Sequence, residues 1–96
     1  MPDSFEVRLL DAAKEDIAET ADPARLLNKI EELKSHPTKR GTPLSGDLAG
    51  YYSFRVGDYR VIYEVDGSTV WIYGAGLRKE GDRDGIYQRA RRWFSE

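Results

Sequence analysis

The amino-acid sequence predicts a small α+β domain, in which an antiparallel β-sheet carries an N-terminal helical hairpin on one face and a short C-terminal helix. Residues 52–65 alternate apolar and polar side chains on both sides of Gly57-Asp58, a dipeptide suited to a tight β-hairpin turn. Residues 11–35 instead place apolar side chains at helical spacing. We therefore expect the helical hairpin to pack on the apolar face of three strands, over 51–56, 59–65 and 69–75.

Length and composition limit the class of protein. The chain has 96 residues, enough for one domain with a core but too few for a deep enclosed active site. It contains no cysteine, which excludes a disulfide framework, a thiol nucleophile and a thiolate metal site. No signal peptide and no long apolar segment stand out, so we expect a single cytoplasmic domain over 1–96 with no membrane partner.

The charge is unevenly distributed. The formal net charge is −2, which argues against a general nucleic-acid coat. Residues 1–38 carry five Lys or Arg against nine Asp or Glu, whereas residues 39–96 carry ten against eight. The C-terminal part is therefore the better place to seek a phosphate-containing partner.

The N-terminal part predicts one strand and two helices. Phe5 to Leu9 alternates and reads as a strand, after which Asp11 is expected to cap a short helix. A second helix has the clearer signature, with Asp22 as its N-cap, Pro23 in its first turn and Pro37 beyond its end. Its apolar side is formed by Leu26, Leu27, Ile30 and Leu33.

A long connection follows over residues 35–50, which are rich in Pro, Gly, Ser and Thr. Lys39 and Arg40 could contact phosphate there, although exposed loop cations are more often only solvated. His36 is the only histidine, and no Asp, Glu or Cys stands at a metal-like spacing from it. We expect it at a helix end rather than in catalysis.

The turn at Gly57-Asp58 fixes the register of the first hairpin. Arg55 is expected to face Arg60, with Phe54 facing Val61 on the opposite side of the sheet. Like charges in that relation destabilise a sheet by about 0.2–1 kcal/mol, so the pair invites an anion to bridge it.

A second turn at Asp66-Gly67 leads to the next strand. In the simplest register Arg60 faces Tyr73 and Ile62 faces Trp71. The polar face would then be a basic patch flanked by aromatic rings, able to bind phosphates and to stack bases. Alternatively, the C-terminal segment covers Trp71 and Ile62, and the pattern alone does not separate the two interpretations.

The C-terminal part consists of a charged turn and a helix. Residues 74–85 are glycine-rich, but they lack the strand, turn and helix order of a nucleotide-binding fingerprint. A final helix is expected from Ile86 to Phe94, with Tyr87 at its start.

In this order of elements the chain resembles the RelE/ParE superfamily of bacterial toxin–antitoxin toxins. The resemblance runs from about Phe5 to Tyr87, and it is carried by Leu44-Ser-Gly, Gly57-Asp-Tyr-Arg-Val-Ile-Tyr63, Gly76-Leu-Arg-Lys79 and Ile86-Tyr87. It implies a RelE-like fold and a cognate antitoxin as partner. The RelE branch further implies an endoribonuclease that cuts messenger RNA on the ribosome without metal or cofactor.

Site residues follow from matching these motifs. The conserved basic positions fall on Ser53, Arg55, Arg60 and Arg78, and the C-terminal tyrosine on Tyr87. Serine replaces the lysine typical of well-known RelE members at position 53, and a short insertion separates Arg78 from Tyr87. Tyr73 or Arg83 could therefore occupy part of that space. We expect Arg55, Arg60, Arg78 and Tyr87 to act in catalysis, and Ser53, Tyr73, Arg83, Lys39 and Arg40 to bind RNA.

The chemistry of RNA cleavage fits these residue types. Without a metal, the ribose 2′-hydroxyl attacks the phosphate and the protein must stabilise a phosphorane that gains negative charge. Arginines suit this task because their planar donors bind phosphate oxygens and stay charged at any working pH. They make poor general bases for the same reason, so that role would fall to Tyr87, to a backbone or ribosomal group, or to water. We expect weak activity on free RNA.

Two other functions stay open. The ParE branch of the same superfamily implies a binding protein that poisons DNA gyrase. A homologue that has lost its target and only binds its antitoxin is the other alternative, in keeping with Ser53 and the acidic total charge.

Overall fold

The computed structural model describes residues 4–77 and 86–93, and at 88, 89, 92 and 93 it describes the backbone alone. Its five-stranded sheet has the order β1-β5-β4-β3-β2. The predicted antiparallel strands are confirmed as β3 (Tyr52–Val56), β4 (Tyr59–Asp66) and β5 (Thr69–Leu77). The sheet is mixed because β1 (Glu6–Leu9) lies parallel to β5, while the short β2 (Thr42–Pro43) pairs antiparallel with β3.

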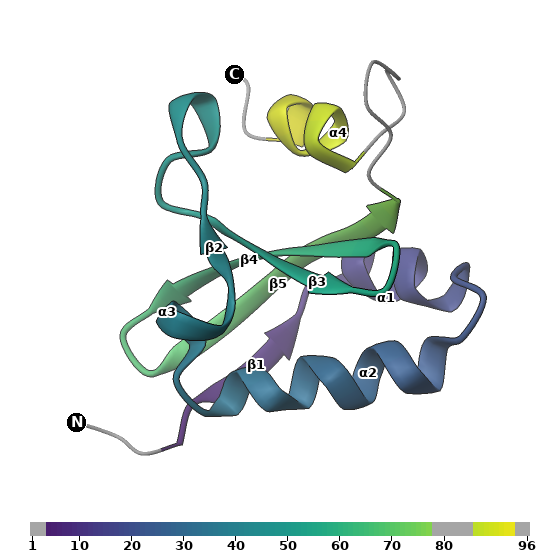
Figure 1. Ribbon diagram of the computed structural model, residues 1–96, viewed down its shortest axis with the longest axis horizontal. Coiled ribbons are helices and arrows are strands. Elements are labelled where there is room, and N and C mark those ends of the chain that lie inside the picture. The colour runs from purple at the N-terminus through teal and green to yellow at the C-terminus, as the bar shows by residue number, and fades with distance from the viewer. Residues whose placement is uncertain (1–3, 78–85, 94–96) are drawn as a thin grey trace.

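Helices cover both faces of this sheet. The helical hairpin of α1 (Asp11–Ala18) and α2 (Pro23–Glu31) lies on one face, and α4 (Ile86–Trp93) lies on the opposite side (Figure 1). A 3-10 turn, η1 (Glu32–Lys34), extends α2. The described helices include none that is long and apolar enough to cross a membrane. The result is the α+β architecture that the periodicities predict.

The main core lies between the helical hairpin and the sheet, as predicted. Phe54, Val61 and Ile72 face the helices and are buried. The other buried members of this cluster are Ala13, Ile17, Leu26, Ile30, Leu33, Val56, Tyr63, Val70 and Ala75.

A second, smaller core lies under α4. Ile62 has no exposed surface and packs with Leu48, Ile86 and Ala90. For Ile62 the covered interpretation is therefore confirmed, because the C-terminal helix occupies that part of the polar face. Trp71 stays half-buried, paired across the sheet with Arg8 of β1 and Glu64 of β4.

One predicted helix cap is present and the other is wrong. Asp22 caps α2, since its Oδ1 accepts a hydrogen bond from the Arg25 N–H at 3.1 Å. Asp11 does not cap α1; the N-cap is Leu10, which continues the extended backbone of β1 with φ −70° and ψ 157°. The helix starts one residue earlier than expected, so Asp11 lies in its first turn. A carboxylate in that position interacts favourably with the positive end of the helix dipole.

The first hairpin has the predicted register and the second does not. Arg55 faces Arg60. In the second hairpin Asp66 faces Thr69, because the two-residue loop is Gly67-Ser68, with Gly67 at a positive φ of 60°, rather than the predicted Asp66-Gly67. An irregularity between Ile62 and Tyr63 shifts the pairing again, so that Arg60 faces Gly76 rather than Tyr73.

The connection over 35–50 is more structured than its composition suggests. It contains α3 (Pro37–Arg40), β2 and a 3-10 turn, η2 (Gly46–Leu48), which reaches toward α4 (Figure 1). His36 stands just before α3, as expected for a helix end, and has a left-handed φ of 53°.

The packing of α4 on Ile62 gives a stability prediction. Shortening this fully buried side chain in Ile62→Ala should lower the free energy of unfolding by about 2–5 kcal/mol, and Ile62→Val by about 0.5–1.5 kcal/mol. Urea denaturation of the two variants beside the unmodified chain measures both values. If Ile62 were exposed, both changes would lie within experimental error of zero.

Candidate nucleic-acid interface

A cleft of about 350 Å³ opens where α3, β2, β3, β4 and α4 meet. It is lined by Arg40, Thr42, Leu44, Ser53, Phe54, Arg55, Arg60 and Tyr87. Three of these side chains are cationic, and the lining includes no carboxylate among the residues that the structure describes. Such a concentration of like charge in a small concave surface attracts anions.

Arg55 and Arg60 both line this cleft, and they stand directly opposite each other on β3 and β4. Each guanidinium donates to a backbone carbonyl nearby, Arg55 Nε to Gly57 O at 3.3 Å and Arg60 Nη1 to Tyr59 O at 3.2 Å. A carbonyl orients an arginine without neutralising it. Within the described parts of the chain neither arginine forms an ion pair with a carboxylate, so their charge is available to a phosphate.

Ser53 and Tyr87 join β3 to α4 at the same cleft. Their hydroxyl oxygens lie 2.8 Å apart, and Ser53 is only 6% exposed while Tyr87 is half-buried. The structure therefore brings five predicted site residues together, Arg40, Ser53, Arg55, Arg60 and Tyr87. Sequence analysis did not predict the hydrogen bond between the two hydroxyls, because 34 residues separate them and no local pattern links them.

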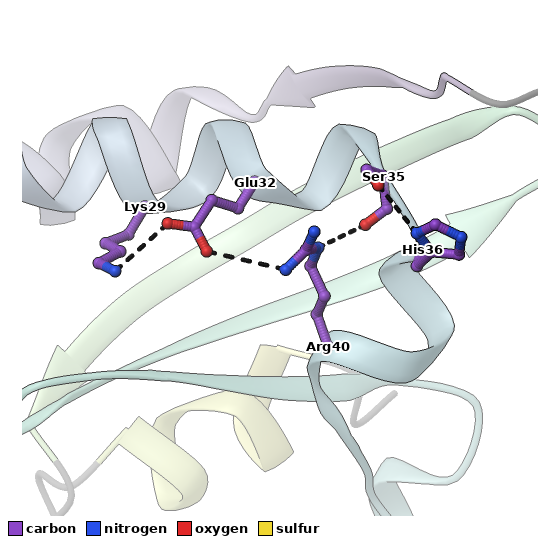
Figure 2. A network of polar contacts seen from close by, with 5 residues as sticks. All are labelled: Lys29, Glu32, Ser35, His36 and Arg40. Atoms are coloured by element: carbon purple, nitrogen blue, oxygen red, sulfur yellow. Dashed lines mark hydrogen bonds and ion pairs between the residues drawn. The ribbon is translucent and has the colours of Figure 1, made fainter.

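Arg40 enters the cleft from α3. Its Nε donates to the Ser35 carbonyl at 2.5 Å, and its Nη1 lies 3.9 Å from Glu32 Oε1, as Figure 2 shows. Glu32 also pairs with Lys29 at 3.3 Å, which divides its charge between two cations. Lys39 is exposed and is not among the residues that line the cleft.

Tyr73 does not join the arginines, because the register of β5 differs from the predicted one. Its hydroxyl donates to Glu64 Oε1 at 2.9 Å, and its ring meets Tyr51 edge to face at 5.5 Å between centroids. Burial and then the hydrogen bond to Glu64 raise the pKa of Tyr73 to about 12. The Glu64 carboxylate beside Tyr73 favours the neutral phenol and would repel a phosphate.

Two predicted site residues, Arg78 and Arg83, lie outside the described residues. Thr42 and Leu44 line the cleft but were missed by sequence analysis. The strand that carries Thr42 has only two residues and one of them is Pro43, so its alternation is too short to be recognised.

The chain is similar in sequence to toxins of type II toxin–antitoxin systems. A family model described as the ParE toxin of the type II toxin–antitoxin system parDE matches residues 7–80. Toxin RelG of Mycobacterium tuberculosis is 34% identical over 90 residues, covering 88% of this chain and 98% of RelG. Toxin RelE of the same organism is 38% identical over 63 residues, covering 52% of this chain and 65% of that relative, slightly less than two thirds of its length.

Solved structures show the same fold. The toxin–antitoxin complex RelBE2 of M. tuberculosis matches with a TM-score of 0.73 and 30% identity, covering 78% of this chain and 92% of the other. The archaeal RelE–RelB complex of Pyrococcus horikoshii matches at 0.61 with 25% identity, covering 77% and 94%. The chromosomal ParDE system of P. aeruginosa, at 10% identity, matches at 0.67 over 81% and 100%, and supports the fold alone.

Proposed function

The chain belongs to the RelE/ParE superfamily of type II toxin–antitoxin toxins, and from that premise we propose that it is an endoribonuclease that cuts messenger RNA on the ribosome and so blocks translation. The observation that carries this proposal is the cross-strand pair Arg55 and Arg60, facing one cleft with the hydroxyl of Tyr87. The similarity to the RelG and RelE toxins supports the same branch.

The two central arginines suit the charge that develops during cleavage. The 2′-hydroxyl oxygen forms a bond to phosphorus while the bond to the 5′-oxygen breaks, leaving a cyclic 2′,3′-phosphate and a 5′-hydroxyl. In the phosphorane-like transition state, negative charge develops on the non-bridging phosphate oxygens. Arg55 and Arg60 have N–H donors beyond those bonded to the backbone, and these donors can bind that charge.

Two protons must also move, one from the 2′-hydroxyl and one to the 5′-oxygen. An arginine cannot serve as the base, because it remains protonated at any working pH. Tyr87 is the aromatic hydroxyl of the cleft, held against Ser53, and we assign it the transfer of one of these protons. The other proton falls to a group of the ribosome or to water, which is why we expect cleavage of free RNA to be weak.

Inhibition of DNA gyrase is the second candidate, because the family model that matches this chain is that of ParE toxins. An arginine-lined cleft also suits a partner with acidic side chains. The ribonuclease is preferred because the cleft combines phosphate-binding cations with a hydroxyl able to transfer a proton.

Two assays on the purified chain separate these functions. We expect it to stop translation in a reconstituted system and to cut the message on the ribosome, while DNA supercoiling by gyrase continues unchanged. Continued translation together with inhibited supercoiling would instead identify the chain as a gyrase inhibitor. Inhibition of neither process would identify an inactive homologue that only binds its antitoxin.

We also propose that a cognate antitoxin binds and neutralises the chain, since both the RelBE2 and the RelE–RelB structures are toxin–antitoxin complexes. An extended or helical segment laid across the helices or along a sheet edge is a common way to bind such a small domain. In the translation assay, adding the small protein encoded next to this chain should restore synthesis. A neighbour that neither copurifies nor restores translation would remove this part of the proposal.

Arg60 gives the sharpest test of the site. Its side chain is half-buried on the face opposite the main core, so Arg60→Ala should leave the fold intact. Loss of a donor that strengthens as the phosphorane forms should cost about 2–4 kcal/mol of transition-state stabilisation, by analogy with removed oxyanion donors. This corresponds to roughly 30- to 900-fold in rate. Single-turnover cleavage of messenger RNA on programmed ribosomes measures it.

Two variants serve as controls for this experiment. Arg60→Lys should recover only part of the rate, because an ammonium supplies charge without the planar fork. Arg8→Ala removes the same charge from β1 at the other edge of the sheet, where Arg8 pairs with Glu6 at 3.0 Å, and should leave the rate unchanged. An unchanged rate in well-folded Arg60→Ala would refute the proposed site.

A further inference from the structure

A buried tyrosine lies behind the cleft. Tyr63 of β4 has no exposed surface, and its ring stacks on Tyr52 with 5.3 Å between centroids. Its hydroxyl leaves the apolar core and donates to the Pro37 carbonyl at 2.6 Å. Burial raises the pKa of Tyr63 far above its usual range, so the phenol stays neutral and keeps this donor.

The same hydroxyl packs against the far end of α3. Gly41 follows this helix, and a Cβ at that position would overlap the hydroxyl oxygen of Tyr63. Gly41 has an ordinary φ of −101°, so glycine is required there by close approach to the phenol rather than by backbone strain. One side chain thus holds the turn at both ends, at Pro37 and at Gly41.

Arg40 stands between these two contacts, at the last position of α3. Its Nε is fixed on the Ser35 carbonyl, and the side chain is still 37% exposed. A guanidinium carries five N–H donors, so its Nη groups can serve an anion while Nε holds the side chain in place. Figure 2 shows the ion pair of Arg40 with Glu32, which is weak because the two charged atoms lie 3.9 Å apart. Arg40 also lines the cleft.

We propose that Tyr63 is a positioning residue for Arg40. Through Pro37 and Gly41 its phenol sets the place of the α3 turn, and thereby presents Arg40 beside Arg55 and Arg60 as a third contact for the phosphates of single-stranded RNA. The identity of the ligand rests on the proposed function, whereas the positioning of Arg40 does not.

Tyr63→Phe removes the hydroxyl and keeps the ring in the core. Tyr59→Phe is the matched control, because Tyr59 stands on the same strand and its hydroxyl also bonds to backbone, accepting from the Ala21 N–H at 3.1 Å. Tyr59 lines a different groove, near Arg25 and Leu77. If Tyr63 had only a structural role, Tyr63→Phe would lower the thermal stability of the chain without changing the position of the Arg40 side chain.

The first measurement needs no RNA. In the full chain, the Nε–H of Arg40 should give an NMR signal that is protected from exchange with solvent, because it donates to the Ser35 carbonyl. We expect Tyr63→Phe to lose this protection and Tyr59→Phe to keep it. Protection that persists in Tyr63→Phe would overturn the positioning role.

The second measurement uses a short labelled single-stranded RNA, with every 2′-hydroxyl methylated so that it cannot be cut. Arg40→Ala and Tyr63→Phe should each weaken binding by roughly three- to tenfold, the range for one lost hydrogen bond. Each should reduce the slope of log affinity against log salt by about 0.7, the value for one phosphate contact on a single strand. The double variant should bind no more weakly than Arg40→Ala.

The outcomes separate the two proposals. If the unmodified chain does not bind this RNA, the proposed function fails, and the NMR signal still decides the role of Tyr63. If RNA binds but Tyr63→Phe has its full effect in the Arg40→Ala background, the positioning role is refuted and the site stands. Should Tyr63→Phe fail to fold, Gly41→Ala displaces the same turn from its other end and should reproduce the loss.

Discussion

Burial of β4 on both faces is the constraint on which the rest of the structure depends. Val61 and Tyr63 face the α1–α2 hairpin, Ile62 faces α4, and none of the three has exposed surface. Two helical layers therefore have to close on this strand. The cleft that contains Arg55 and Arg60 opens beside α4, whose Tyr87 helps to line it. The place of the site thus follows from how the domain buries its central strand.

Two helices outside the sheet also contribute side chains to the cleft. Tyr87 comes from α4, which is held by the apolar contact with Ile62 and by the hydrogen bond to Ser53. Arg40 comes from α3, which is held by the phenol of Tyr63. Core residues thus fix the positions of two side chains at the surface. Both positions are therefore set by contacts within the domain itself.

The features that could be predicted from the sequence are those with a local cause. The turn at Gly57-Asp58 fixes the register that sets Arg55 against Arg60, and Asp22 caps α2 as its position suggests. The second hairpin could not be predicted in the same way. Its loop is Gly67-Ser68 rather than Asp66-Gly67, and an irregularity between Ile62 and Tyr63 shifts the pairing once more, so that Arg60 faces Gly76 and not Tyr73. The local sequence pattern neither distinguishes these two turns nor marks the irregularity.

The proposed ribonuclease activity requires that the cleft of Arg55, Arg60 and Tyr87 receive the scissile phosphate of messenger RNA. The most direct measurement is the cryo-electron microscopy structure of this chain on a programmed ribosome, with a 2′-O-methyl group blocking the nucleophile of the message. We expect to find the chain in the decoding site, with the phosphate within hydrogen-bonding distance of both arginines and the Tyr87 hydroxyl beside it. A message bound over the α1–α2 hairpin, or a chain bound away from the decoding site, would contradict it.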